Sequence, residues 1–152
     1  MRILCFGKSG LLSTELQKWL PELNAESLDF LDRTDCDITD PKSVTHAFSQ
    51  YQPTVVINAA AYTKVDQCEE EESLASAING NALNQIVTSC NEFNATLIHF
   101  STDYVFDGEK DAPYEEIDQT NPVSAYGRSK LIGEKIIQDI CKQFYILRVQ
   151  WV

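Results

Sequence analysis

The sequence predicts an α/β fold in which a doubly wound parallel sheet carries helices on both faces. Two observations lead to this prediction. Short apolar runs alternate with longer segments of helical period, and a glycine turn follows the first apolar run directly. Strands and helices that alternate in this way form right-handed βαβ units around a parallel sheet. With 152 residues, 43% of them hydrophobic, the chain can build one sizeable core, and we expect a single domain over residues 1–152.

Five apolar runs are expected to form buried strands, because they are short and apolar almost throughout. They span residues 2–6, 27–30, 54–60, 96–102 and 144–149. Helices are expected between them, over residues 14–20, 41–51, 73–93 and 124–142. Asp40 and Pro41 mark one helix start, since aspartate caps free N–H groups and proline fits the first helical position. Residues 107–122, rich in Asp, Glu, Gly and Pro, are expected to form a long loop, which at that length is more often functional than idle.

The charge of the chain limits the class of its partners. The formal net charge is -11 and the isoelectric point is near 4.5. An acidic surface repels a phosphate backbone at long range, so we expect no nucleic-acid partner. An anionic dinucleotide is not excluded by this argument, because local backbone N–H groups can hold its phosphates.

The cysteine and hydropathy patterns predict a cytoplasmic protein. The five cysteines are odd in number and show neither a CxxC pair nor zinc-ligand spacing, so we expect reduced thiols and no metal site. No segment approaches the roughly 20 apolar residues that cross a bilayer. Residues 7–10 interrupt the apolar N-terminal run, which leaves it too short for a secretory signal. We therefore expect no membrane partner.

A candidate phosphate-binding turn follows the first expected strand. Gly7, Gly10 and Ser13 are spaced as GxxGxxS, and a helical segment begins at once. Glycines let the backbone turn tightly and approach a pyrophosphate, which then lies at a helix N-terminus. The serine in place of the usual third glycine packs less closely and adds a hydroxyl. A tight strand–helix turn without a ligand would have a similar sequence, so this motif needs support from elsewhere.

An acidic residue is expected about 20 residues after the turn, at the end of the second strand, to bind the adenosine ribose. Asp29 meets this expectation, and Asp32 and Arg33 lie nearby. The carboxylate of Asp29 favours NAD, whereas Lys8 and Arg33 are compatible with the extra phosphate of NADP. The sequence leaves both cofactors open.

A candidate catalytic group is formed by Tyr126, Lys130 and Thr102. Tyrosine and lysine four residues apart share one face of a helix. A phenol has a pKa near 10, and a neighbouring ammonium is expected to lower the pKa of Tyr126. Tyr126 could then protonate a carbonyl oxygen as a reduced nicotinamide delivers hydride. Thr102 ends an expected strand, where ligands of open α/β sheets bind, and would offer its hydroxyl to the same oxygen.

The YxxxK pair alone has a simpler explanation, because this spacing is common on solvated helix faces. Its weight comes from the order of four elements along the chain. A glycine turn is followed by an Asn-Ala-Ala segment after a strand, by a Ser-Thr pair at a strand end, and by YxxxK at a helix start. Together these elements favour a dinucleotide-dependent reductase.

The same elements resemble the extended short-chain dehydrogenase/reductases and, more narrowly, the dTDP-4-dehydrorhamnose reductase family. The resemblance rests on FGKSG at 6–10, NAAAYTKVD at 58–66, STDYVFDG at 101–108, YGRSK at 126–130 and GEK at 133–135. The second and third of these strings are the most specific. The resemblance extends from residue 2 to residue 152 and implies a Rossmann-type NAD(P)-binding domain.

The resemblance also implies a reaction. The family uses NADPH or NADH to reduce the 4-keto group of dTDP-6-deoxy-L-lyxo-4-hexulose, which gives dTDP-L-rhamnose. It therefore implies a dTDP-sugar as the small-molecule substrate. Tyr126 would be the proton donor, and Lys130 would be its partner and a contact of the cofactor ribose. The sugar would meet Thr102, Asp103 and Trp151.

The residues that hold the cofactor follow from the same resemblance. The pyrophosphate is expected along Gly7, Gly10, Leu11 and Leu12. The adenosine is expected near Asp29, Asp37 and Ile38, and the rest of the cofactor along Ala60, Ala61, Thr63, Tyr126 and Lys130. Glu15 matches a position linked to magnesium in some members, but the other metal positions would lie beyond residue 152, so magnesium is not supported here.

Three departures from the family pattern stand out. Ser13 replaces a glycine, and Gln150 replaces a small polar residue before the tryptophan. The chain also ends directly after an expected core strand, so we expect a truncated or partial form without the C-terminal substrate domain of the family. That domain carries much of the sugar-nucleotide site, and positioning contributes several kcal/mol to catalysis. The chain alone is therefore expected to bind cofactor and to turn over poorly or not at all, and a homodimer is expected only of a longer form.

Two other functions fit the sequence. A regulatory subunit of methionine adenosyltransferase resembles the same family and binds NADP without catalysing a reduction. Thr102, Tyr126 and Lys130 favour an enzyme but are compatible with such a binder. Epimerases and dehydratases of other nucleotide sugars share the YxxxK pair, although they usually keep GxxGxxG and hold their cofactor permanently.

Overall fold

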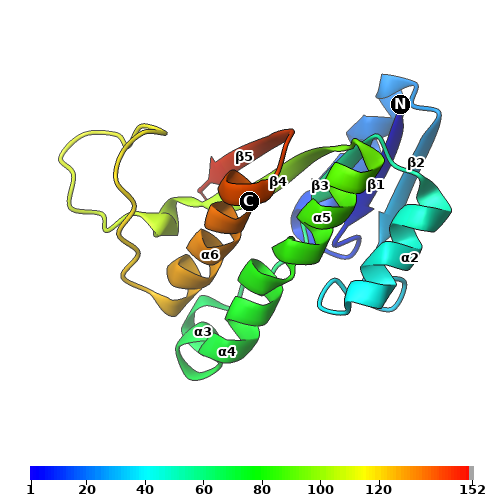
Figure 1. Ribbon diagram of the computed structural model, residues 1–152. Helices are drawn as coiled ribbons and strands as arrows, with labels where there is room; N and C mark the ends of the chain where they lie inside the picture. Colours follow the sequence, from blue (N-terminus) through cyan, green and yellow to red (C-terminus); the bar gives the residue numbers. More distant parts are fainter. Residues whose placement is uncertain (151–152) are drawn as a thin grey trace.

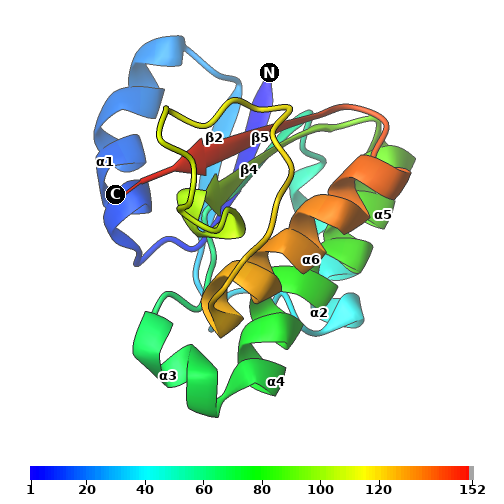
Figure 2. The same ribbon diagram turned by 90° about the vertical axis from the view of Figure 1, so that its left-hand side faces the viewer.

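The computed structural model describes residues 1–150 and contains one parallel sheet of five strands in the order β2-β1-β3-β4-β5 (Figure 1). The strands are β1 (Arg2–Phe6), β2 (Ser27–Leu31), β3 (Val55–Asn58), β4 (Thr96–Thr102) and β5 (Phe144–Val149). Every neighbouring pair is parallel, and helices cover both faces of the sheet (Figure 2). The predicted fold class is confirmed.

Three strands have the bounds that the sequence predicted, namely β1, β4 and β5. β2 extends one residue beyond its predicted end, to Leu31. β3 is shorter than predicted and ends at Asn58 instead of Ala60. The Asn58 side chain accepts a hydrogen bond from Ala60 N at 3.2 Å, which turns the chain out of the sheet.

The long helices are α1 (Leu11–Trp19), α2 (Pro41–Tyr51), α5 (Leu83–Phe93) and α6 (Ala125–Ile140). The bounds of α2 are those predicted, and the Asp40 carboxylate caps it by accepting from Lys42 N at 3.0 Å. α1 begins earlier than residue 14, because Gly10 takes the N-cap position and its carbonyl accepts from Thr14 N. α1 continues as a 3₁₀ turn over Leu20–Leu23. Among residues 1–150, no helix combines the length and apolar character that crossing a bilayer requires.

The helix predicted over residues 73–93 is present, since the backbone stays helical from Glu72 to Phe93, but a π-helix divides it. Together with the short helix before it, this part of the chain contains four elements. They are α3 (Val65–Glu70), α4 (Glu72–Ala75), a π-helix over Ser76–Asn81, and α5. The π-helix turns the Asn79 side chain inward, where it bonds both backbone groups of Tyr62, accepting from N at 2.8 Å and donating to O at 3.0 Å. π-Helical stretches inside α-helices are frequent at functional sites.

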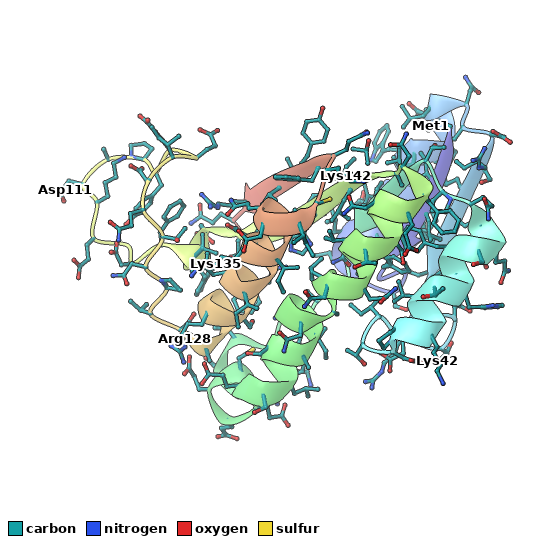
Figure 3. The ribbon with its side chains drawn as sticks, viewed as in Figure 1. Met1, Lys42, Asp111, Arg128, Lys135 and Lys142 are labelled. Atoms are coloured by element: carbon teal, nitrogen blue, oxygen red, sulfur yellow. The ribbon has the colours of Figure 1, made fainter. Side chains whose placement is uncertain are left out.

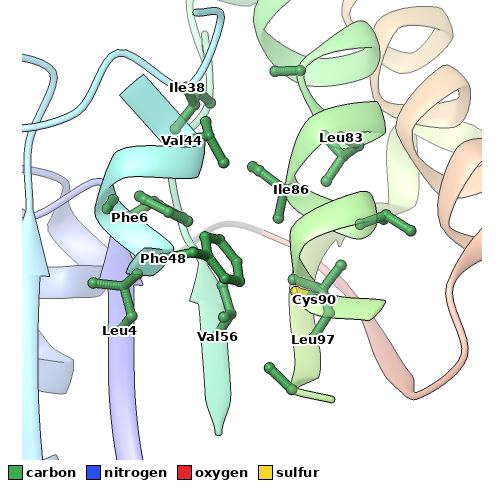
Figure 4. Close-up of a cluster of buried hydrophobic side chains, with 14 of the residues drawn as sticks. Leu4, Phe6, Ile38, Val44, Phe48, Val56, Leu83, Ile86, Cys90 and Leu97 are labelled. Atoms are coloured by element: carbon green, nitrogen blue, oxygen red, sulfur yellow. The ribbon is translucent and has the colours of Figure 1, made fainter. Parts of the chain in front are cut away.

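Two apolar clusters hold the sheet between its helices. The larger cluster packs one face of the sheet against α2, α5 and α6, with Phe6 and Phe48 at its centre (Figure 4). Their rings lie 6.4 Å apart. The smaller cluster packs the other face against α1 through Ile3, Cys5 and Leu16. Because both faces are covered, the strand ends at the sheet edge are the positions left for a ligand.

The loop over residues 107–122, here named the acidic loop, extends away from the sheet, with its side chains projecting outward (Figures 1 and 3). The Tyr114 hydroxyl donates to Asp107 at 2.7 Å, and the Lys110 ammonium lies 2.5 Å from the carboxylate of Asp118. These contacts are internal to the loop. The sequence correctly predicted an irregular segment here.

The turn after β1 requires glycine for two reasons. Gly7 has a φ of +95°, and a Cβ built on it would lie 2.6 Å from Ala60 N. We predict that Gly7→Ala lowers the free energy of unfolding by about 3 kcal/mol, because left-handed strain and overpacking both contribute. Denaturant unfolding of both proteins measures the difference.

Gly108→Ala is the matched control. Gly108 also has a positive φ, +80°, but a Cβ there would have no atom within 4 Å in the described part of the chain. This change should cost only the backbone strain, about 1 kcal/mol. Equal losses in the two variants would show that the contact with Ala60 contributes nothing.

Candidate active site

The expected site residues gather at the edge of the sheet where its parallel strands end. Gly7 follows β1, Ala60 lies just beyond β3, and Thr102 is the last residue of β4. The near contact of Gly7 with the Ala60 backbone places the glycine turn directly against the chain that leaves β3. Ligands of open α/β sheets bind at this edge, so the structure brings the turn and the catalytic strand end to one region.

The glycine turn leads into a helix N-terminus that can receive an anion. Gly10 is the N-cap of α1, and within residues 1–150 no side chain caps this helix and no acidic residue lies in its first turn. Gly10 N donates to Gly7 O at 2.9 Å, which closes the turn. The first N–H groups of α1, at Leu11 and Leu12, therefore remain available as donors, and the helix dipole favours negative charge there.

Ser13 faces the interior and not the edge of the sheet. Its side chain is fully buried, and its Oγ lies 3.8 Å from the sulfur of Cys5. The extra hydroxyl that the sequence places at the third position of the motif thus contacts the core.

The acidic residue at the end of β2 is Asp32 and not Asp29. Asp29 lies in the middle of the strand, which continues to Leu31. Leu31 O accepts a hydrogen bond from Lys8 N at 3.0 Å, so the end of β2 touches the glycine turn. Hydrogen bonds from Thr34, and to a smaller extent the charge of Lys8, hold the pKa of Asp32 below its usual range. The sequence predicted Asp29, with Asp32 nearby, in a strand ending at residue 30; the strand ends at Leu31, and Asp32 is the acidic residue directly beyond it.

The other residues expected to line the cofactor are spread along this edge. Asp37 accepts from Thr39 N at 2.9 Å in the loop before α2. The side chain of Ile38 is buried in the larger core cluster and is not exposed to a ligand. Ala61 is half-buried and Thr63 exposed in the segment between β3 and α3.

The three candidate reacting groups meet between β4 and α6. Thr102 is nearly buried at the end of β4, and its hydroxyl donates to Asp103 at 3.1 Å. Tyr126, in the first turn of α6, interacts with the Thr102 hydroxyl. One turn later, the Lys130 ammonium donates to Phe100 O at 2.6 Å. The shared face that the YxxxK spacing predicts is therefore directed onto β4.

Burial controls the protonation of both groups. Lys130 is only 2% exposed, and burial lowers its pKa from 10.5 to about 8, partly offset by the charge of Glu134. Burial raises the pKa of Tyr126, while its interaction with Thr102 acts in the opposite direction. The prediction that the pKa of Tyr126 is lowered is therefore wrong, because desolvation by burial dominates it. The phenol stays protonated at neutral pH, which is the form that donates a proton.

The sequence did not predict the role of Asn79, which supports the helix that carries these groups. Its side chain donates to Ser129 Oγ at 2.9 Å and bonds the backbone of Tyr62. A Cβ on Gly133 would lie 2.5 Å from Asn79 O, so α6 packs directly on the π-helix.

One of the residues expected to meet the sugar borders a wide hollow of about 1080 Å³ between the acidic loop and β5, whereas Thr102 does not line it. Asp103 lies on its wall, in a short 3₁₀ helix (Asp103–Val105) directly after Thr102. Gln150 also lines it. Trp151, the third predicted sugar contact, lies outside the described residues.

The magnesium-linked position is used in another way. Glu15 is exposed on α1 and pairs with Lys18, with 2.6 Å between Oε1 and Nζ. Within the described part of the chain, no group of three or more His, Cys, Asp or Glu side chains is arranged to hold a metal ion.

The burial of Lys130 predicts a gain in stability when its charge is removed. A pKa lowered from 10.5 to about 8 corresponds to a cost of about 3 kcal/mol for the charged side chain in the folded state. Lys130→Met should therefore raise the free energy of unfolding at pH 7 by up to this amount. Thermal or urea unfolding measures the change.

The pH dependence gives an independent check. Between pH 8 and 10.5 the unfolded chain binds more protons at Lys130 than the folded chain, so the stability of the wild type should rise with pH in this window relative to Lys130→Met. The free energy of unfolding that Lys130→Met gains over the wild type should be largest below pH 8 and should disappear near pH 10.5. A difference that is constant with pH would contradict a charged, buried lysine.

Comparison with known proteins gives consistent matches over the whole chain. The family described as the RmlD substrate binding domain matches residues 1–152. A dTDP-4-dehydrorhamnose reductase of Salmonella typhimurium is 43% identical over 154 residues, and the alignment covers 100% of this chain. Among solved structures, a dTDP-4-dehydrorhamnose reductase from Clostridium acetobutylicum superposes with a TM-score of 0.94 at 42% identity over 99% of this chain. A reductase of the same name from Bacillus anthracis, in complex with NADP, gives 0.94 at 33% identity over 99% of this chain.

The chain spans about half the length of the relatives it matches. The alignments cover 52% of the Salmonella protein, 54% of the Clostridium protein and 53% of the Bacillus protein. The matching half contains the glycine turn and all three candidate reacting groups.

Proposed function

Because this chain belongs to the RmlD substrate binding domain family, we propose that the protein of which it forms a part is a dTDP-4-dehydrorhamnose reductase. Such an enzyme reduces the 4-keto group of a dTDP-4-keto-6-deoxyhexose with NADH or NADPH. The observation that carries this proposal is the convergence of Thr102, Tyr126 and Lys130 at the strand ends beside the glycine turn. The names of relatives at about 40% identity support the substrate class.

The residues present fit a dinucleotide. The tight turn at Gly7 and the uncapped N-terminus of α1 provide backbone N–H donors for a pyrophosphate. Asp32, Asp37 and the backbone of Ile38 stand at the ends of β2 and the following loop, where an adenosine would lie. When bound, the reduced nicotinamide supplies the hydride.

Three side chains would perform the remaining chemistry. The protonated phenol of Tyr126 donates its proton to the carbonyl oxygen as negative charge develops there. The Thr102 hydroxyl donates a hydrogen bond to the same oxygen and orients it. Lys130, held against Phe100 O, places a positive charge close to the tyrosinate that remains and stabilises it.

The preference for NADH or NADPH is left open by the charges at the adenosine end. The carboxylates of Asp29 and Asp32 suit the free ribose hydroxyl of NADH, and Lys8 and Arg33 suit the phosphate of NADPH. The Bacillus anthracis relative was solved with NADP. We propose a cytoplasmic location because the five cysteines are free thiols, as is usual in a reducing compartment.

Replacing the proton donor tests the proposal. We predict that Tyr126→Phe in the longer protein lowers kcat by about 10²- to 10⁴-fold, the usual contribution of a general acid, with cofactor affinity nearly unchanged. The assay follows NAD(P)H consumption with a dTDP-4-keto-6-deoxysugar.

Tyr104→Phe is the matched control for this experiment. The Tyr104 ring contacts that of Tyr126 edge to face at 5.8 Å, but its side chain is exposed. The control should keep most of the activity. Equal rates for wild type and Tyr126→Phe would remove Tyr126 from the proposed mechanism.

The 152-residue chain alone is predicted to bind cofactor and to reduce the sugar poorly. It contains the reacting groups but only half the length of its relatives, and lost positioning can cost several kcal/mol of the barrier. Calorimetric titration with NADPH and with NADH should show binding, and turnover should lie far below that of the longer protein. Comparable turnover by the two proteins would contradict this division of roles, and a homodimer of the longer form remains a prediction.

A further inference from the structure

A buried ion pair lies behind the candidate reacting groups. Glu134 on α6 is fully buried. Arg148 on β5 contacts both of its carboxylate oxygens, with Nε at 3.0 Å from Oε1 and Nη2 at 2.7 Å from Oε2. This two-point contact between a guanidinium and a carboxylate is the most directional form of ion pair.

The carboxylate of Glu134 is placed between two of the reacting groups. It lies one helical turn beyond Lys130, on the same side of α6. Its Oε1 also accepts a hydrogen bond from Ser101 Oγ at 2.5 Å, and Ser101 directly precedes Thr102. One carboxylate therefore contacts the strand end that carries Thr102 and lies beside the ammonium of Lys130.

Arg148 extends the same network to the acidic loop. Its Nη1 donates to Glu116 O at 3.2 Å. Its guanidinium lies 5.0 Å from the centre of the Phe106 ring, and this ring stacks on Tyr114 at 4.1 Å. A change at Arg148 would thus reach both α6 and the wall of the hollow.

Stability alone does not explain such a pair. Two charges taken from water lose about as much solvation as their attraction returns, and apolar replacements of buried pairs are often neutral or stabilising. Glu134 is also the only acidic side chain buried within residues 1–150. Its position beside a buried ammonium suggests a functional reason for the pair.

We propose that Glu134 and Arg148 form a positioning unit that sets the electrostatic environment of Lys130 and holds the strand end that carries Thr102. The catalytic role of this unit rests on the proposed function, but its effect on the charge of Lys130 does not. Neither residue is assigned a contact with substrate or cofactor. Glu134 favours the charged form of Lys130, and Arg148 limits that effect by balancing the carboxylate.

Other titratable groups on this side of the sheet do not replace Glu134. Burial lowers the pKa of His99 on β4 well below its usual value, so this side chain is neutral. Glu72 on α4 is exposed and paired with Arg128 at 2.8 Å. Lys135 and Asp139 on α6 are exposed, as are the acidic residues of α3. Other titratable groups on the neighbouring elements include Tyr126, Cys68 on α3, Cys90 on α5, Asp103 and Tyr104 in the 3₁₀ helix, and Glu116 in the acidic loop.

The test measures the titration of Lys130 directly, on this chain and without substrate or cofactor. Lysine labelled with ¹³C at Cε gives one NMR signal for each side chain, and Lys130→Arg identifies the signal of Lys130. In the wild type its midpoint should lie near 8. In Glu134→Gln, which keeps the shape of the side chain, the midpoint should fall by about one pH unit.

Arg148→Gln should move the midpoint in the opposite direction. Without the guanidinium, Lys130 becomes the nearest cation to the carboxylate, so its charged form is favoured and the midpoint rises. The double variant, which removes both charges of the pair together, should lie between the two single variants, and Arg148→Lys should restore the wild-type value. General damage to the fold would move both single variants in the same direction, and that outcome would overturn the proposal.

Arg128→Gln is the control, because it removes an exposed charge from the same helix (Figure 3). Its Lys130 midpoint should stay at the wild-type value. If one single variant fails to fold by circular dichroism, the other still decides the matter by the direction in which its midpoint moves. The midpoint of the double variant should then lie on the wild-type side of that single variant, and no shift in the folded single variant contradicts the unit.

A second measurement separates this inference from the proposed function. In the longer protein, the loss of kcat at high pH should shift down in Glu134→Gln and up in Arg148→Gln, following the two midpoints. NMR midpoints that shift as expected in a protein without reductase activity would refute the proposed function and leave the electrostatic unit intact. Unshifted midpoints in an active reductase would refute the unit alone.

Discussion

The position of one buried ammonium depends on how closely α6 approaches the sheet. Lys130 reaches Phe100 O at 2.6 Å only because the helix that carries it has glycine where its neighbours come nearest. A Cβ on Gly127 would lie 2.2 Å from Tyr104 O, and one on Gly133 would lie 2.5 Å from Asn79 O. Close packing of this kind desolvates the lysine, directs Tyr126 toward Thr102 and makes a compensating carboxylate necessary. The chemistry of the site follows from a steric condition on the helix.

Much of the fold could be predicted from the sequence because its signals are local. The strand over 96–102 and the helix over 41–51 were predicted with their correct bounds, since an unbroken apolar run and an Asp-Pro start are complete within a few residues. The helix predicted over 73–93 is present, but the π-helix within it was not predicted, and there the side chain of Asn79 bonds the backbone of Tyr62, 17 residues away. Helical period carries no information about such a partner.

In the candidate site, too, local patterns were predicted correctly and contacts between distant residues were not. Spacing placed Tyr126 and Lys130 on one helix face, and motif order placed Thr102 beside them. Spacing could not show that burial, and not the charge of a neighbour, dominates the pKa of Tyr126. Nor could it show the pair of Glu134 and Arg148, because charged residues in a sequence resemble solvated surface until the fold buries them.

The acidic loop is held mainly by itself, through Tyr114 with Asp107 and Lys110 with Asp118. It joins the end of β4 to the start of α6, next to the reacting groups, without forming part of the sheet or its core. Insertions and deletions in such a segment leave the scaffold intact. Descendants of this fold are therefore free to diversify the wall of the hollow while inheriting an unchanged cluster of Thr102, Tyr126 and Lys130, which is a route by which new specificities evolve.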